Sequence, residues 1–366
     1  MNSLNAVTSA ITSVVMAAVM TAVMSASGGA QSLASRVAQA PDGVVRMQFE
    51  SRMGVCGDGA DVVGFRNAMF ARNFQSFGRW TSTNCVPGPL RVTLTVADGQ
   101  VARVRTQVGG AWPATDGRVT DFGVVPSSDA SAFFFSLVPR LETAGKDRLL
   151  LPAVLAEEGV VIPPLIALAR DGARADETRR QAMMWLGMLG DDSGRRALRA
   201  VIEDGDETRK MRAAAIFSLA HGGDTPDAEF AWLRGLYAQL PGDELKEAVL
   251  HGMTQDEERG SRWLIERARD ERETRKLRKT AIFWAGQSEA TRTAALVSFY
   301  DDARDEALRE HAIFVLSQRK DEAATNALIR IVQRDADTRM RGKALFWLAQ
   351  NKDPRVVKLI SDLVLR

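Results

Sequence analysis

One pattern of polar and apolar positions recurs along the second half of the chain. Each copy begins with acidic or threonine residues, continues with an arginine in most cases, and reaches an alanine within a mixed apolar run. The alanines are spaced by 31 to 33 residues: Ala182, Ala215, Ala248, Ala281, Ala312 and Ala344. A repeat of fixed length in this range is the sequence signature of stacked helical units. We call the six predicted helices that carry these alanines the anchor helices.

Positions at fixed distances from each alanine carry residues of one kind. Three positions before it stands an arginine, replaced by Leu245 in the third copy: Arg179, Arg212, Arg278, Arg309 and Arg341. Two positions after it stands a large apolar residue: Met184, Phe217, Leu250, Phe283, Phe314 and Phe346. Five positions after it the residue is small, except for Met253. Because apolar residues cover more than one face of each anchor helix, we predict that it is packed on two sides.

A second amphipathic segment follows each anchor helix. The last one places Val356, Ile360 and Leu363 at helical spacing after Pro354, a residue that suits the first turn of a helix. The intervening turns often carry an aspartate that can cap the next helix: Asp191, Asp224, Asp321 and Asp353. Each unit is therefore predicted to be a helix–turn–helix pair that begins with the anchor helix. A degenerate pair, at about residues 146–157 and 160–170, is predicted to start the array.

The residues Arg341, Ala344, Leu348, Ala349 and Asp353, with their equivalents in the other copies, form a motif that resembles the short HEAT repeats of bilin-lyase-like proteins. The resemblance implies a mainly α fold with a right-handed α-solenoid of about six or seven helix pairs over residues 127–366. It also implies that the second helix of each pair lines the concave side. It implies no single activity, since this fold hosts many tasks.

Residues 41–126 carry the alternating pattern of β-strands, and we predict a small β-rich domain there. Strands are predicted at 44–50, 91–96 and 101–108. Asp98-Gly99 separates the last two, and Asp-Gly between two alternating runs is the strongest short-range signal for a hairpin. A helix over 130–141 follows good capping residues, so the boundary with the helical repeats is expected near residue 126.

Residues 1–40 have the character of a targeting segment. The run Ile11–Met24 is apolar over 14 residues, which is shorter than the ~20 residues that span a bilayer. It predicts a secretory signal cleaved after Ala30 or Ala40, and therefore an exported protein, periplasmic or secreted, with no membrane span in the mature chain. No Lys or Arg precedes Arg36, so an uncleaved anchor and a misplaced start codon stay open as alternatives.

The chain has two cysteines, Cys56 and Cys85. In an exported chain they are predicted to form a disulfide, whereas in a cytosolic chain they would be free thiols. The three histidines, His221, His251 and His311, do not occur in the His-Glu pairs that hold iron in some HEAT-repeat enzymes. We therefore predict no metal and no cofactor.

The charge balance and the motifs narrow the function classes. Lys and Arg number 48 against 46 Asp and Glu, a formal net charge of +2, which argues against a dedicated nucleic-acid binder. No nucleophile elbow, phosphate-binding loop or dinucleotide fingerprint occurs in the sequence. We therefore predict a protein that is not an enzyme.

Two recurring positions are the candidate binding residues for a partner protein or peptide. Six positions after the alanine stand polar residues: His221, Gln287, Gln318 and Gln350. Three positions after it stand tryptophans: Trp185, Trp284 and Trp347. The amides could instead bond helix-end carbonyls, and core packing is the default for the tryptophans.

The favoured function is a non-catalytic scaffold in the cell envelope that recognises its partner on the solenoid surface. The alternatives are a lyase-type or other modifying enzyme, with its site where the β domain meets the first repeats, and a structural element of a larger envelope assembly.

Overall fold

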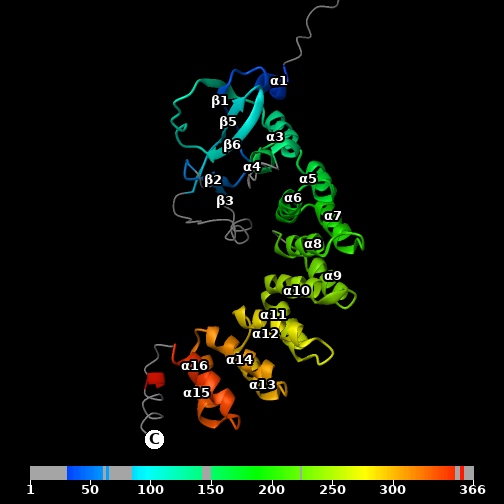
Figure 1. The fold of residues 1–366 in the computed structure, drawn as a ribbon, viewed down its shortest axis with the longest axis vertical. Helices are drawn as coiled ribbons and strands as arrows, with labels where there is room; N and C mark the ends of the chain where they lie inside the picture. Colours follow the sequence, from blue (N-terminus) through cyan, green and yellow to red (C-terminus); the bar gives the residue numbers. More distant parts are fainter. Residues whose placement is uncertain are drawn as a thin grey trace, which may run out of the picture.

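The structure of the chain is a computed structural model, and it describes residues 31–60, 63–65, 85–141, 150–222, 225–350 and 355–357. The chain is mostly helical, with a small β region towards its N-terminal side (Figure 1). The predicted signal Ile11–Met24 and most of the helix predicted after Pro354 lie outside the described residues. Within them, no helix combines the length and the apolar character needed to cross a membrane.

A four-stranded sheet forms the larger part of the β region. Its strands lie in the order β6-β5-β1-β7, and their bounds are β1 (Gly43–Phe49), β5 (Leu90–Ala97), β6 (Gln100–Val108) and β7 (Val119–Val124). β1 pairs antiparallel with β5 and parallel with β7. Asp98 and Gly99 both have positive φ, 52° and 67°, as a two-residue hairpin turn with the right twist requires. The predicted hairpin is therefore confirmed.

A three-stranded sheet in the order β3-β2-β4 carries the two cysteines. It consists of β2 (Val55–Gly57), β3 (Val63–Phe65) and β4 (Val86–Pro87). Cys56 and Cys85 form a disulfide, with their Cα atoms 5.1 Å apart. The predicted disulfide is thus confirmed, and it ties β2 to the chain that leads into β4.

α3 (Ser127–Leu141) and α4 (Leu150–Leu155) connect the sheets to the repeats, and the short α1 (Leu33–Ala38) precedes the first strand. Phe134 of α3 packs on Phe49 of β1, with ring centroids 5.9 Å apart. Arg52 donates to the carbonyls of Val154 and Gly159, each at 2.7 Å. The β region is therefore fixed to the start of the helical stack by buried rings and by a guanidinium group.

Twelve of the described helices form the stack. The anchor helices are α6 (Asp176–Leu189), α8 (Arg209–His221), α10 (Gly242–Gly252), α12 (Arg275–Gln287), α14 (Glu306–Gln318) and α16 (Thr338–Leu348). The helices that alternate with them are α5 (Ile162–Arg170), α7 (Asp192–Glu203), α9 (Asp227–Tyr237), α11 (Glu257–Arg269), α13 (Thr293–Asp302) and α15 (Glu322–Arg334). A single 3-10 turn, η4 (Met253–Gln255), separates α10 from α11.

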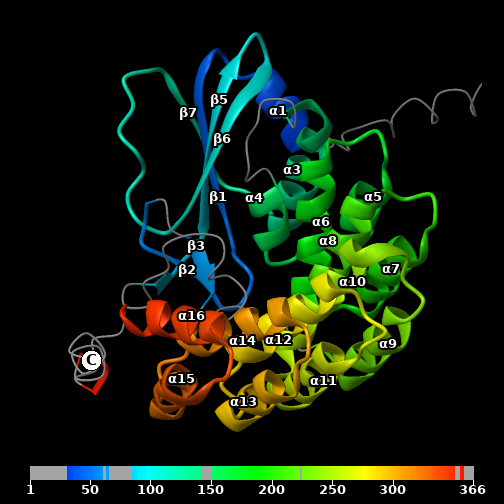
Figure 2. The same cartoon turned by 60° about the horizontal axis from the view of Figure 1, so that its bottom comes forward.

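The stack bends into an arc, and the two sets of helices take opposite sides of it. In both ribbon views α8, α10, α12, α14 and α16 follow the inner side, whereas α7, α9, α13 and α15 follow the outer side (Figures 1 and 2). We call these the inner and outer sides of the stack.

The order of helices within each pair is the reverse of the predicted one. Among the described helices, α6, α8, α12 and α14 each pack more extensively on the helix before them than on the helix after them, and α16 packs on α15. Asp191 caps α7 by accepting from the N–H groups of Ser193 and Gly194, and Asp321 caps α15, whereas Asp224 and Asp353 lie outside the described residues. These turns join one pair to the next, however, so the anchor helix is the second of its pair. The helices predicted to be second in each pair, such as α7, α9, α13 and α15, lie on the outer side, so the expectation that they line the concave side was wrong (Figures 1 and 2).

A repeated arginine contact explains the pairing. Arg179, Arg212 and Arg278 each donate through Nε to the carbonyl ten residues earlier, at 3.0, 2.8 and 2.8 Å. These carbonyls belong to the last turn of the preceding helix, where no intrahelical donor exists. The copy with Leu245 lacks the guanidinium, and its pair, α9 and α10, has the least contact of the six.

The arginine contact predicts a stability difference between two neighbouring substitutions. Arg278→Met keeps the apolar stem but leaves the Ala268 carbonyl without its donor, so we expect the free energy of unfolding to fall by about 1–3 kcal/mol. Arg275→Met removes an exposed ion pair with Asp305 and should cost about 0–1 kcal/mol. Urea unfolding followed by fluorescence measures both. Equal losses in the two variants would contradict the assigned role.

The disulfide predicts a stability that depends on redox state. Closing a loop of 29 residues stabilises the folded state by about 3–4 kcal/mol on a chain-entropy estimate. Thermal unfolding of the protein should therefore begin at a lower temperature when a phosphine reductant is present. The double variant Cys56→Ser/Cys85→Ser is the control and should not respond to the reductant. A parent protein with the same transition in both conditions would disprove the expectation.

Candidate functional site

Aromatic side chains of five successive anchor helices form one row. They stand two, three or six positions after the repeat alanine, and such positions share one face of a helix. We call them the ring row: Phe217, His221, His251, Phe283, Trp284, Phe314, Phe346 and Trp347. The anchor helices that carry these rings follow the inner side of the stack (Figure 2).

The rings contact one another without a break from α8 to α16. Ring centroids are 4.8 Å apart between His221 and His251, and 4.2 Å between His251 and Trp284. Further along, Phe283 and Phe314 lie 6.4 Å apart with parallel planes, and Phe314 lies 5.2 Å from Trp347. Contacts within this range are favourable beyond their buried area. The row therefore both joins neighbouring repeats and presents a continuous apolar strip.

The predicted tryptophans do not share one environment. Trp185 is buried, with 4% of its surface exposed, and it lies in the core rather than on the ring row. Trp284 and Trp347 are half-buried, and the ring row reaches solvent most clearly at its ends, where Phe217 is 38% and Phe346 60% exposed. Exposed aromatic residues beside half-buried ones are typical of binding surfaces.

The histidines of the row act as neutral aromatic rings at neutral pH. Burial, with a smaller effect of the neighbouring His251, lowers the pKa of His221 to about 4. Burial also lowers the pKa of His251. His221 stacks on Phe217 with centroids 4.0 Å apart, and its Nδ1 lies 3.0 Å from the Phe217 carbonyl. His251 was not among the binding residues predicted from the sequence, although it occupies the same repeat position as Trp284 and Trp347.

The three predicted amides stand at the ends of the last three anchor helices. Gln287, Gln318 and Gln350 are all exposed. At the end of α12, Arg319 donates to the carbonyls of Gly286 and Ser288 at 3.2 Å. The Gln318 amide donates to the Ser317 hydroxyl at 3.3 Å.

A hollow of about 500 Å³ lies between the ends of α14 and α16. Among its lining residues are Gln318, Lys320, Trp347 and Gln350. It brings three of the predicted binding residues, one tryptophan and two amides, to the same place.

Opposite charges join the first halves of the anchor helices. Lys210 of α8 lies 2.7 Å from Asp176 of α6, and Lys276 of α12 lies 2.7 Å from Glu247 of α10. Similar pairs connect α12 to α14 and α14 to α16: Arg275–Asp305, Arg339–Glu306 and Lys343–Glu310. We call this set the charge ladder. Each of its charges is balanced by a neighbour, so the ladder is close to neutral beside the ring row.

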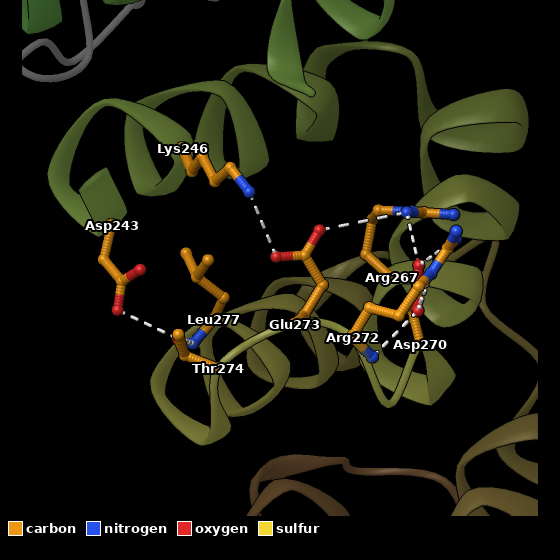
Figure 3. Close-up of polar contacts among 8 residues, drawn as sticks. All are labelled: Asp243, Lys246, Arg267, Asp270, Arg272, Glu273, Thr274 and Leu277. Carbon is orange, nitrogen blue, oxygen red and sulfur yellow. Dashed lines mark hydrogen bonds and ion pairs between the residues drawn. The ribbon is translucent and has the colours of Figure 1, made fainter. Parts of the chain in front are cut away.

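A further charged cluster lies where α10, α11 and α12 meet (Figure 3). The Glu273 carboxylate lies 3.4 Å from Lys246 and 3.9 Å from Arg267, and Asp270 is bound by Arg267 and Arg272 at 2.9 and 2.8 Å. Hydrogen bonding from Arg272 holds the pKa of Asp270 well below its usual range. The ion pairs among its three cations and two carboxylates join α10 to the pair of α11 and α12.

A smaller cavity, of about 360 Å³, lies where the β region meets the stack. Its lining includes Arg52, Met53, Glu157 and the buried Trp185. Arg52 donates hydrogen bonds to backbone carbonyls. The carboxylate among the lining residues is Glu157. Across the described part of the chain, no three His, Cys, Asp or Glu side chains gather as a metal site would require.

No family model and no curated protein matches the chain. Among solved structures, human deoxyhypusine hydroxylase in complex with glycerol is 20% identical, with a TM-score of 0.31 over 65% of this chain and 96% of that one. The complex of CpcE and CpcF of phycocyanin lyase from Nostoc sp. PCC7120 is 17% identical, with a TM-score of 0.30 over 53% of this chain and 78% of that one. Similarity at this level assigns no family, activity or partner.

The lowered pKa of His221 predicts that the free energy of unfolding falls as the solution becomes acidic. The folded state favours the neutral His221 ring, so this stabilisation is complete above pH ~6.5 and is lost as the pH falls towards 4. From pH 7 to pH 5 the parent should lose about 1–2 kcal/mol more than His221→Phe, which keeps a ring but does not titrate. Urea unfolding at both pH values measures the difference. Parallel losses in both proteins would show that His221 is not the group responsible.

Proposed function

We propose that the protein is an exported, non-catalytic scaffold that binds another protein or a peptide along the inner side of its helical stack. The observation that carries the proposal is the ring row, in which eight rings of five successive helices form one strip with exposed ends. An extended surface of stacked repeats suits the recognition of an extended partner. The exposed amides at Gln287, Gln318 and Gln350 add hydrogen-bonding groups along the same strip.

The proposal includes the organisation of the chain. A targeting segment over residues 1–40 directs export, a disulfide-bonded β domain covers 41–126, and a right-handed solenoid of HEAT-like pairs covers 127–366. The Cys56–Cys85 disulfide is compatible with an oxidising compartment. Arginine contacts hold α8 and α12 of the ring row against the helices before them, and charge-ladder pairs join the same two helices to α6 and α10.

The second candidate is a modifying enzyme with its site at the junction of the β region and the stack. The cavity of about 360 Å³ at that junction favours it. Its lining is mostly apolar, as ligand sites commonly are, with Glu157 and Arg52 as the charged groups.

Capture of partners from an envelope extract tests the scaffold. We expect the immobilised full chain, with its disulfide oxidised, to retain one reproducible protein. Trp284→Ala/Trp347→Ala should reduce its recovery at least tenfold, because truncating central aromatic residues of an interface costs about 2 kcal/mol or more. Trp232→Ala is the matched control: Trp232 is a half-buried tryptophan on the outer helix α9, packed against Arg199.

The comparison also separates the two candidates. If the captured protein is recovered equally with the parent, with Trp284→Ala/Trp347→Ala and with the Trp232→Ala control, binding at the ring row is contradicted. A small molecule recovered with the chain, and lost in a Trp185 variant instead, would move the function to the junction cavity.

A further inference from the structure

We infer that one face of the four-stranded sheet docks on an anionic membrane surface. Helices α1, α3 and α4 lie against one face of this sheet, and the chain between β6 and β7 lies on the other (Figure 2). We call this second face the outer sheet face. The inference goes beyond the proposed scaffold function, because it concerns the β region and not the ring row.

The strand register places four arginines on the outer sheet face. Residues directly opposite one another in paired strands point to the same face, and the residues that alternate with them, such as Met47 and Val92, are fully buried on the other side. Opposite pairs link the arginines across the sheet through Thr93, which faces both Arg46 and Arg105. The four come from three neighbouring strands, so that their charge covers an area: Arg46 of β1, Arg91 of β5, and the exposed Arg103 and Arg105 of β6.

The paired strands of this face carry one carboxylate. Asp121 of β7 lies opposite Arg46 and forms an ion pair with it at 2.7 Å. Four arginines and one aspartate give a formal charge of 4 − 1 = +3, and the chain between β6 and β7 adds Asp116 and Arg118, which cancel. The whole chain has a formal charge of +2, so the remainder of the molecule carries 2 − 3 = −1. An anionic surface therefore attracts this face in particular and orients the molecule.

Trp112 holds two of the arginines in place. The guanidinium groups of Arg46 and Arg91 lie 5.2 and 5.3 Å from the centroid of its ring. The buried Gln107 amide donates to the Ala111 carbonyl at 2.8 Å and so fixes the chain directly before Trp112. Stacking on an aromatic ring leaves a guanidinium charged but restricts its movement. These charges are thus positioned before a partner arrives, which lowers the entropy lost on binding.

Exposed apolar side chains lie on the same face as the arginines. Val119 and Val124 of β7 are 37% and 70% exposed, and they lie opposite Val44 and Gln48 of β1. A bilayer surface offers anionic headgroups to the arginines and the boundary of the acyl chains to the valines. A soluble polyanion such as nucleic acid would bind the arginines and leave the valines in water. The combination therefore favours a membrane over a soluble polyanion.

Co-sedimentation of the full chain with lipid vesicles tests the inference. One set of vesicles is phosphatidylcholine alone, and the other is an equal mixture of phosphatidylcholine and phosphatidylglycerol. Residues 1–30 carry no charged side chain, so any attraction of this apolar segment to vesicles does not depend on the charge of the lipid. We expect the anionic vesicles to bind at least tenfold more tightly, and the difference to shrink as salt is added.

Two double variants locate the binding. Arg103→Gln/Arg105→Gln should weaken binding to the anionic vesicles about 25-fold, because each arginine near an anionic surface contributes about fivefold. Arg330→Gln/Arg334→Gln is the matched control: it removes the same charge from exposed positions of the outer helix α15 and should change binding little. Circular dichroism and urea unfolding confirm that both variants are folded. Equal losses in the two variants would overturn the inference.

Two further outcomes would also overturn it. One is binding that is equally tight for neutral and anionic vesicles. The other is double-stranded DNA that binds through Arg103 and Arg105 while the anionic vesicles do not, which would assign the outer sheet face to a soluble polyanion. Neither outcome affects the scaffold function, which is tested by capture through Trp284 and Trp347. Conversely, Trp284→Ala/Trp347→Ala should leave vesicle binding unchanged, so the two proposals can fail separately.

Discussion

The backbone carbonyls at the end of an α-helix have no partner within that helix, and in this stack a side chain from the next helix supplies one. The Nε groups of Arg179, Arg212 and Arg278 meet the same carbonyl, ten residues back, in three different repeats. In these three repeats the contact holds the anchor helix against the helix before it. The ring row lies on the anchor helices, including α10, where Leu245 stands in place of the arginine.

The third repeat shows what replaces the contact when the arginine is missing. Leu245 is buried there, and the neighbouring Lys246 instead reaches Glu273 in the turn before the next anchor helix. Arg179 and Arg309 form ion pairs of the same kind, with Glu207 and Asp335. The arginine contact within a pair is thus found at three repeats, and ion pairs of this second kind start from α6, α10 and α14.

Much of the architecture could be predicted from local chemistry. Asp98-Gly99 specified its hairpin because few residues adopt positive φ, and the spacing of the alanines specified the repeat. The order within pairs could not be predicted, because a capping aspartate such as Asp191 fits a turn inside a pair and a turn between pairs equally well. Trp185 and Trp284 occupy the same repeat position, yet one is buried and the other is not. Their difference depends on the β region that packs near the first repeat, which no local pattern reveals.

The sign of the charge in the charge ladder alternates from one anchor helix to the next. Along the inner side, acidic groups on α6, α10 and α14 alternate with basic groups on α8, α12 and α16, as the pairs Asp176–Lys210, Glu247–Lys276 and Glu310–Lys343 show. Removing or inserting a single repeat would place two helices of like sign side by side, and like charges at contact distance repel. Two repeats together can be added or removed without that conflict.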